Sequence, residues 1–268
     1  MAKFKPRPME TYKKAGHEKV NGINMYYEIY GEGEIPLVLI HGGGSTIQST
    51  FGRLIPFLAK SGQVIAVELQ AHGRTSDRDQ AESFEQDAKD MATLLNQLKI
   101  TKANFLGFSN GGTTTLHIAA HYPVVANKII VISANYQRDG LIDGFYSGFG
   151  DATIDHMPEP LKIAFLAVNP DQNALQTMFE KDKQRMLDFT DLSDDDLRGI
   201  TSDTLLMVAD KDVIKPEHVV KMSRLIANTQ LVILPGVHGA MIGENLNPDV
   251  TDKTIEITVH LVETFLNQ

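Results

Sequence analysis

The 268-residue chain contains no cysteine. It can therefore form no disulfide, thiolate zinc site or iron–sulfur cluster, and it has no cysteine nucleophile. No apolar run approaches the roughly 20 residues that a membrane-spanning helix needs. The basic stretch over residues 1–14 also lacks the apolar segment of a secretory signal peptide. We therefore expect no membrane span and a cytoplasmic location.

Basic residues are in deficit, with 25 Lys and Arg against 34 Asp and Glu, which gives a formal net charge of −9. An acidic surface repels phosphate backbones, so we expect no nucleic-acid partner. The glycine-rich patterns of nucleotide-binding loops, G-x-x-x-x-G-K-[ST] and G-x-G-x-x-G, are absent as well. The sequence favours a small molecule as its partner.

Short apolar runs alternate with helix-length segments. Apart from residues 24–30, whose polarity alternates, the runs are typical of strands buried on both faces of a parallel sheet. They cover 24–30, 36–40, 63–69, 103–108, 128–133, 204–209 and 230–234. Helices are expected near 48–60, 83–99, 110–122, 217–227 and 250–267. The alternation predicts an α/β fold with right-handed crossovers.

The alternation stops between residues 135 and 200, where no strand-like run occurs. Two helical stretches are expected there, followed by a short helix that begins at Ser193, because Ser193 and Asp196 have capping-box spacing. We expect this segment to be a helical cap over one end of the sheet. The predicted domains are a core of residues 1–134 and 201–268 and a cap of residues 135–200.

One serine lies where a predicted strand meets a predicted helix. The sequence GFSNG over residues 107–111 matches G-x-S-x-G, with strand 103–108 before it and helix 110–122 after it. Such a turn exposes the hydroxyl at the positive end of the helix. The backbone N–H of Asn110 then faces an oxygen on the carbon that Ser109 attacks. We expect Ser109 to be a nucleophile and Asn110 to provide one oxyanion-hole donor.

A second glycine-rich turn, His41 to Gly44, follows the predicted strand 36–40. Glycines let the main chain approach a ligand closely and leave its N–H groups accessible. A phosphate-binding loop is the alternative, but the motifs of such loops are missing. We expect Gly43 to provide the second oxyanion-hole donor.

A serine hydroxyl needs a base that removes its proton, and the chain offers nine histidines. Most lie in predicted helices or turns, where a packing or surface role is expected. His218, at a predicted helix start after Pro216, is expected to be solvated. His238 lies in the loop between the last strand and the last helix, at the sheet edge where a shared crevice forms. We expect His238 to be the base.

The base needs a carboxylate that fixes its tautomer. Asp210 and Asp212 follow the predicted strand 204–209, and from the residues alone either could reach His238. Whichever acts, the chain order is serine, aspartate, histidine.

Taken together, these motifs resemble the α/β-hydrolase fold family, from about residue 20 to the C-terminus. The match rests on the His41-Gly42 turn, the serine turn, the acid loop and the histidine loop, in the order that this family shows. The resemblance implies a mostly parallel central sheet with helices on both faces and a helical cap. It also places the acid on Asp212 rather than Asp210, although Ala209 stands where the family usually has glycine.

The resemblance implies a serine hydrolase of the carboxylic ester class, which acts through an acyl-enzyme on a small or medium ester or lactone, with no cofactor and no metal. The predicted cap has no tryptophan, and its large apolar residues favour a mostly apolar substrate; they are Phe145, Tyr146, Phe149, Met157, Phe165, Met178, Phe179 and Met186. C–C bond, enol-lactone or aminoacyl-amide hydrolysis and perhydrolysis stay open as alternatives. A ligand-binding protein of low turnover is a further alternative.

Overall fold

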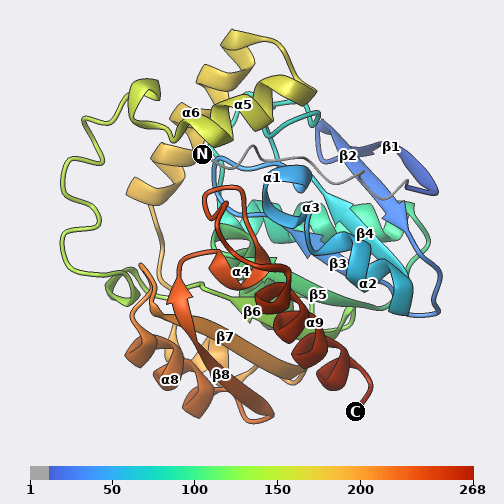
Figure 1. The fold of residues 1–268 in the computed structure, drawn as a ribbon. Coiled ribbons are helices and arrows are strands. Elements are labelled where there is room, and N and C mark those ends of the chain that lie inside the picture. The colour runs from blue at the N-terminus through green and yellow to red at the C-terminus, as the bar shows by residue number, and fades with distance from the viewer. Residues whose placement is uncertain (1–11) are drawn as a thin grey trace.

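The computed structural model describes residues 12–268, so most of the basic stretch 1–14 lies outside it. Within this part of the chain a central sheet has the strand order β1-β2-β4-β3-β5-β6-β7-β8 (Figure 1). Its strands are β1 (Lys14–Val20), β2 (Ile23–Tyr30), β3 (Leu37–Ile40), β4 (Val64–Val67), β5 (Ala103–Phe108), β6 (Ala126–Ile132), β7 (Asp203–Lys211) and β8 (Thr229–Val237). Strand β2 pairs antiparallel with β1 and β4, and all other pairs are parallel.

Helices cover both faces of this sheet. One apolar core lies between the sheet and α3 (Phe84–Gln97), α4 (Asn110–His121) and α8 (Pro216–Leu225). A second core lies on the other face, beneath α1 (Ile47–Phe51), α2 (Ile55–Ser61) and α9 (Asp252–Leu266). Strands β3, β4 and β5 are buried at every position because both of their faces are covered. The predicted fold class, a mostly parallel α/β sheet with helices on both faces, is confirmed.

Two details differ from the sequence-based expectation. Strand β1 was not predicted, because its residues are mostly polar and partly exposed. It forms a hairpin with β2 through Asn21-Gly22, both at positive φ, and this dipeptide was the available signal. The helix expected over 48–60 is two helices, since α1 ends at Phe51 with Gly52 as its C-cap, and α2 has Pro56 in its first turn.

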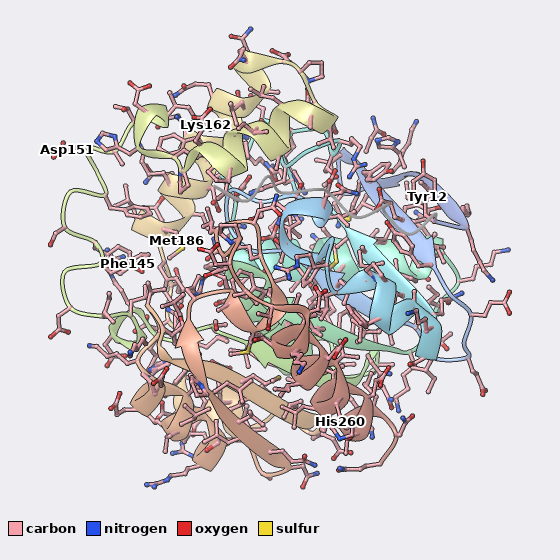
Figure 2. All side chains as sticks on the ribbon, in the orientation of Figure 1. Tyr12, Phe145, Asp151, Lys162, Met186 and His260 are labelled. Atoms are coloured by element: carbon pink, nitrogen blue, oxygen red, sulfur yellow. The ribbon has the colours of Figure 1, made fainter. Side chains whose placement is uncertain are left out.

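Between β6 and β7 the chain forms helices and loops but no strand. This segment contains η1 (Arg138–Gly140), η2 (Ile154–His156), α5 (Glu159–Val168), α6 (Gln172–Leu187) and α7 (Asp194–Arg198). The predicted capping box of Ser193 and Asp196 is present at the start of α7. In Figure 2 the long loop that carries Phe145 and Asp151 runs along the side of the molecule, whereas Met186 lies on α6 near the sheet. Among residues 12–268, no helix is both long enough and apolar enough to cross a bilayer.

The backbones of β5 and α4 approach each other closely at two glycines. A Cβ on Gly107 would overlap the carbonyl oxygen of Gly111, and a Cβ on Gly111 would overlap the carbonyl oxygen of Ile40. Backbone atoms cannot move aside as a flexible side chain can, so neither position tolerates a side chain without displacing α4. This contact fixes the helix against the centre of the sheet.

We therefore expect Gly107→Ala to lower the free energy of unfolding by about 1–3 kcal/mol, the usual cost of overpacking. Urea unfolding followed by far-UV circular dichroism would measure it. Gly62→Ala is the matched control, because a Cβ there meets no atom within 4 Å and the backbone is extended. Equal stability of the two variants would contradict this account of the β5–α4 contact.

Candidate active site

Ser109 lies at the junction of β5 and α4 in an unusual backbone conformation. Its φ of 54° and ψ of −123° are unfavourable for any residue with a side chain. The turn is held by a hydrogen bond from the Ser109 N–H to Ile132 O, at 2.9 Å, and by one from the Gly112 N–H to Ser109 O, at 2.8 Å. The strain is thus maintained by the neighbouring strand and the first turn of α4.

The structure brings together the three residues that the sequence selected as nucleophile, acid and base. The Oγ of Ser109 lies 3.1 Å from Nε2 of His238, and Nδ1 of His238 lies 2.6 Å from Oδ1 of Asp212. These atoms come from three segments: the β5–α4 turn, the loop after β7 and the loop after β8. The two distances allow a proton to pass from the hydroxyl to the imidazole, while the carboxylate fixes the ring.

Asp212 is enclosed by donors. Its Oδ2 accepts a hydrogen bond from Ser133 Oγ at 2.6 Å, and its Oδ1 accepts one from the Ile214 N–H at 3.1 Å. Burial acts to raise the pKa of Asp212, but the hydrogen bonds from His238 and Ser133 hold it below its ordinary value. Asp210 has a different partner, because its Oδ1 accepts from the Gly236 N–H at 2.8 Å. Of the two candidate acids, only Asp212 contacts His238.

The His41–Gly44 turn lies beside the serine turn. A Cβ on Gly42 would lie 3.2 Å from the Ser109 Cβ, and one on Gly43 would lie 2.6 Å from the side-chain nitrogen of Asn110. The backbone N–H groups of Gly43 and Asn110 form no hydrogen bond with another described residue. Two unpaired donors beside a serine hydroxyl are what a developing oxyanion requires.

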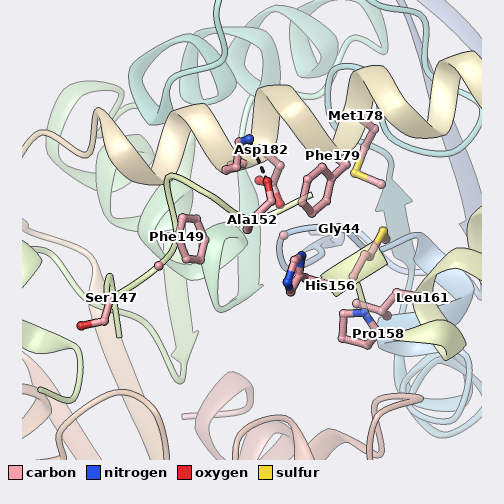
Figure 3. A pocket seen from close by; sticks show the side chains of 14 residues that line it. Gly44, Ser147, Phe149, Ala152, His156, Pro158, Leu161, Met178, Phe179 and Asp182 are labelled. Atoms are coloured by element: carbon pink, nitrogen blue, oxygen red, sulfur yellow. Dashed lines mark hydrogen bonds between the residues drawn. The ribbon is translucent and has the colours of Figure 1, made fainter. Parts of the chain in front are cut away.

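A cavity of about 390 Å³ is lined by Gly43 and Gly44 and by residues of the segment between β6 and β7. Its walls are mostly apolar. Of the aromatic and methionine residues that the sequence predicted for a cap, Phe149, Met157, Met178 and Phe179 line it, whereas Phe165 and Met186 are buried in cores. Figure 3 shows Phe179 and Asp182 pointing from α6 toward Gly44 and His156.

Asp182 brings a carboxylate into this apolar wall. Its Oδ1 accepts a hydrogen bond from Asn110 Nδ2 at 3.2 Å and also pairs with Arg185. Burial acts to raise the pKa of Asp182, but Arg185 holds it below its ordinary value. Arg185 also contacts Asp87 at 2.7 Å and Glu82 at 3.6 Å. Burial raises the pKa of Asp87 to about 7 and raises the pKa of Glu82 well above its usual range. Asp182 is therefore ionised at neutral pH, whereas burial holds the pKa values of the other two carboxyl groups above their ordinary range.

Glu244 is a second buried carboxyl next to the histidine loop. It is 3 % exposed, its Oε1 accepts a weak hydrogen bond from Ser45 Oγ at 3.4 Å, and its Oε2 has no partner among the described residues. Burial raises its pKa to about 7, with the nearby His238 opposing the shift. Glu244 is thus a titrating group that connects the loop of His238, through Gly239, with Ser45 next to the His41–Gly44 turn.

Sequence reasoning missed these supporting residues and was wrong about one histidine. His218 is not solvated but 7 % exposed; it stacks on Tyr136 and accepts a hydrogen bond from the Tyr136 N–H at 3.3 Å. Burial lowers the pKa of His218 to about 4. Ser133, Asp182 and Glu244 carried no motif, so nothing in the sequence marked them. Within residues 12–268, no group of three or more His, Asp or Glu could hold a metal ion.

Comparison with known proteins gives a consistent family signal. A family model described as alpha/beta hydrolase fold matches residues 35–183. The human protein named serine hydrolase BPHL is 35% identical over 138 residues, which are 50% of this chain and 47% of that protein. The chain thus spans about half the length of that curated relative. The 2-hydroxy-6-oxo-2,4-heptadienoate hydrolase of Pseudomonas putida is 25% identical and is matched over 73% of this chain and 79% of its own.

A solved structure extends the similarity of fold to nearly the whole chain. The meta-cleavage product hydrolase of Pseudomonas fluorescens IP01 superposes with a TM-score of 0.76 at 22% identity, and the match covers 96% of this chain and 98% of that one. At this identity the match supports the shared fold alone.

The buried carboxyl of Glu244 makes stability depend on pH. The unfolded chain releases this proton near the ordinary value of 4.5, whereas the folded protein holds it to about 7. The contribution of Glu244 to the free energy of unfolding is therefore fully present below pH 4.5 and is lost as the pH rises through 7. Glu244→Gln cannot ionise at this position. We expect its free energy of unfolding, relative to that of the unsubstituted protein, to be about 2–3 kcal/mol more favourable at pH 8 than at pH 5.

Denaturant unfolding at both pH values measures this difference. Glu256→Gln on the exposed face of α9 is the control, because it removes the same charge without burial. If the stability of Glu244→Gln relative to the unsubstituted protein does not depend on pH, Glu244 is not a buried titrating group.

Proposed function

The chain belongs to the alpha/beta-hydrolase family, and from that premise we propose that it is a serine hydrolase that cleaves carboxylic esters or lactones. One observation carries the proposal: Ser109 Oγ lies 3.1 Å from His238 Nε2, and Asp212 lies 2.6 Å from the other ring nitrogen. Nucleophile, base and orienting acid are thus within hydrogen-bond reach of one another.

In the proposed reaction His238 takes the hydroxyl proton as Ser109 attacks the carbonyl carbon. Asp212 keeps the ring oriented and stabilises the imidazolium. The negative charge on the carbonyl oxygen is held by the N–H groups of Asn110 and Gly43, each contributing about 3 kcal/mol in the transition state. His238 then returns the proton to the alcohol that leaves. Water, activated by the same imidazole, attacks the acyl-enzyme and releases the acid.

We propose that residues 135–200 act as the cap and that the cavity they cover receives the acyl group. Its volume of about 390 Å³ and its apolar walls suit a small or medium acyl chain. Because Gly43 lines this cavity, a carbonyl held by the proposed oxyanion hole lies beside a space that can take its acyl substituent.

Hydrolysis of a C–C bond in a dienoate is the second candidate, because the Pseudomonas putida relative is named for such a substrate. A dienoate carries a carboxylate. In this chain the cavity wall presents the carboxylate of Asp182, which repels a second negative charge. This observation favours an ester or lactone over a dienoate.

A substrate panel distinguishes the candidates. Purified protein would be assayed with short and medium 4-nitrophenyl esters, a five-membered lactone, a 2-hydroxy-6-oxo-dienoate and an aminoacyl anilide. We expect the highest kcat/KM among the esters or lactones. A higher value for the dienoate would replace ester hydrolysis with C–C bond cleavage as the proposed function.

The role of Ser109 is tested by substitution. We expect Ser109→Ala to lower kcat on the best ester by at least about a thousandfold, since members of a triad act as one unit. A fluorophosphonate probe should label the unsubstituted protein at Ser109 and leave Ser109→Ala unlabelled, with the modified peptide identified by mass spectrometry. Ser223→Ala is the control, because within the described part of the chain that hydroxyl bonds only to Val220 O in α8. Near-normal turnover by Ser109→Ala would refute the assignment.

A further inference from the structure

Besides Asp182, the cavity is lined by the polar side chains of Ser147, His156 and Lys183, and the hydrolytic mechanism uses none of the four. Lys183 is engaged elsewhere, because its Nζ pairs with Glu180 and donates to Ala152 O, whereas the carboxylate of Asp182 faces the proposed oxyanion hole. It enters from α6 and lies beside the proposed oxyanion hole, since a Cβ on Gly43 would be 2.5 Å from its Oδ2. Oδ1 is occupied by Asn110 and Arg185, whereas Oδ2 accepts no hydrogen bond from any described residue. One carboxylate oxygen therefore remains available to a substrate.

The buried cluster behind Asp182 holds this oxygen in place. The side chain of Arg185 is 1 % exposed and connects Asp182 with Asp87 on α3. Lys181, on the other side of Asp182 in α6, pairs with Asp77. Ion pairs therefore hold α6 in place on both sides of Asp182. Glu82, with a fully buried side chain, has no hydrogen-bond partner in this cluster and lies 3.6 Å from Arg185. Three carboxyl groups, those of Asp182, Asp87 and Glu82, thus surround the guanidinium of Arg185.

This arrangement has an electrostatic consequence for the reaction. An ionised carboxylate near the oxyanion hole opposes the negative charge that forms on the substrate oxygen, because the Asp182 side chain is only 14 % exposed and solvent screens it weakly. A positive charge on the substrate, placed between Asp182 and the carbonyl, would offset that repulsion and satisfy Oδ2. A negative charge at the same position would meet repulsion in both the ground state and the transition state.

We propose that Asp182 binds a protonated amine on the acyl side of the substrate, close to the carbonyl that Ser109 attacks, and so selects cationic over neutral and anionic acyl groups. The substrate class is an ester whose acyl part carries an ammonium group beside the carbonyl and an apolar chain for the cavity. This inference rests on the proposed hydrolytic function, and it adds a specificity-determining residue from the segment 135–200.

The test compares three matched benzyl esters that share a propyl chain and differ at the carbon next to the carbonyl. These are the esters of 2-aminopentanoic acid, pentanoic acid and, as the monoester, propylmalonic acid, so that this carbon carries an ammonium, a hydrogen or a carboxylate. We expect kcat/KM to fall in that order, with the amino ester preferred over the neutral ester by about tenfold or more. Equal values for the amino and neutral esters would overturn the proposal.

The second arm changes the carboxylate itself. Asp182→Asn should reduce the amino-to-neutral ratio of kcat/KM by about tenfold or more and should improve the malonyl ester relative to the neutral one. The ratio is taken within each variant, so a general loss of folded protein cancels. Asp188→Asn, an exposed position at the end of the same helix, is the charge-matched control and should keep the original ratio. An unchanged ratio in Asp182→Asn would overturn the role of Asp182.

A binding arm separates failure of this inference from failure of the proposed function. Ser109→Ala protein is titrated by calorimetry with 2-aminopentanamide and with pentanamide, neither of which is an ester. Tighter binding of the amino compound, lost in the Ser109→Ala, Asp182→Asn double variant, supports the amine site even if none of the three esters is hydrolysed. Equal binding of the two amides contradicts the amine site, whereas hydrolysis of the neutral ester by the unsubstituted protein would leave the hydrolase proposal standing.

Discussion

The close contact between the backbones of β5 and α4 is the constraint on which the rest of the site depends. Gly107 leaves no space between β5 and α4, and Gly111 leaves none between α4 and the end of β3, so the chain must turn sharply at Ser109. The turn takes the serine to a φ of 54°, which a residue with a side chain adopts only when its surroundings enforce it. The same turn places the N–H group of Asn110, which has no partner among residues 12–268, at the start of α4 beside the serine.

Parallel strands explain how distant residues reach this turn. Strands β5, β6, β7 and β8 are neighbours in the sheet and run in the same direction, so the loops after them meet at one edge. Ser109 follows β5, Ser133 follows β6, Asp212 follows β7 and His238 follows β8. Each of the four strands thus contributes one member of a continuous hydrogen-bonded chain, from Ser133 through Asp212 and His238 to Ser109.

Buried carboxyl groups give this site its electrostatic character. Asp212 stays ionised because donors outweigh its burial, whereas burial raises the pKa of Glu244 to about 7 because it has one weak partner. Asp182 is ionised through Arg185 and faces the cavity. The balance between burial and polar partners therefore keeps Asp212 and Asp182 ionised at neutral pH, while Glu244 titrates near neutrality.

The sequence by itself determined the fold class and the residues at which to look for the site, because both depend on local pattern. Apolar runs predicted strands buried on two faces, and a serine between glycines at a strand end predicted the turn at Ser109. The polar edge strand β1 escaped this reasoning because it packs against little and lacks an apolar run. The choice of Asp212 over Asp210 came from family resemblance and not from the residues, since both follow the same strand.

Only the tertiary structure decided which side chains support these residues. Asp212 turns toward His238 while Asp210 bonds to Gly236, although the two lie two positions apart. The contacts of Ser133 with Asp212, Asn110 with Asp182 and Ser45 with Glu244 join residues 79, 72 and 199 positions apart. No local pattern encodes such pairs, because sheet order and the packing of α6 against the core set the distances between them.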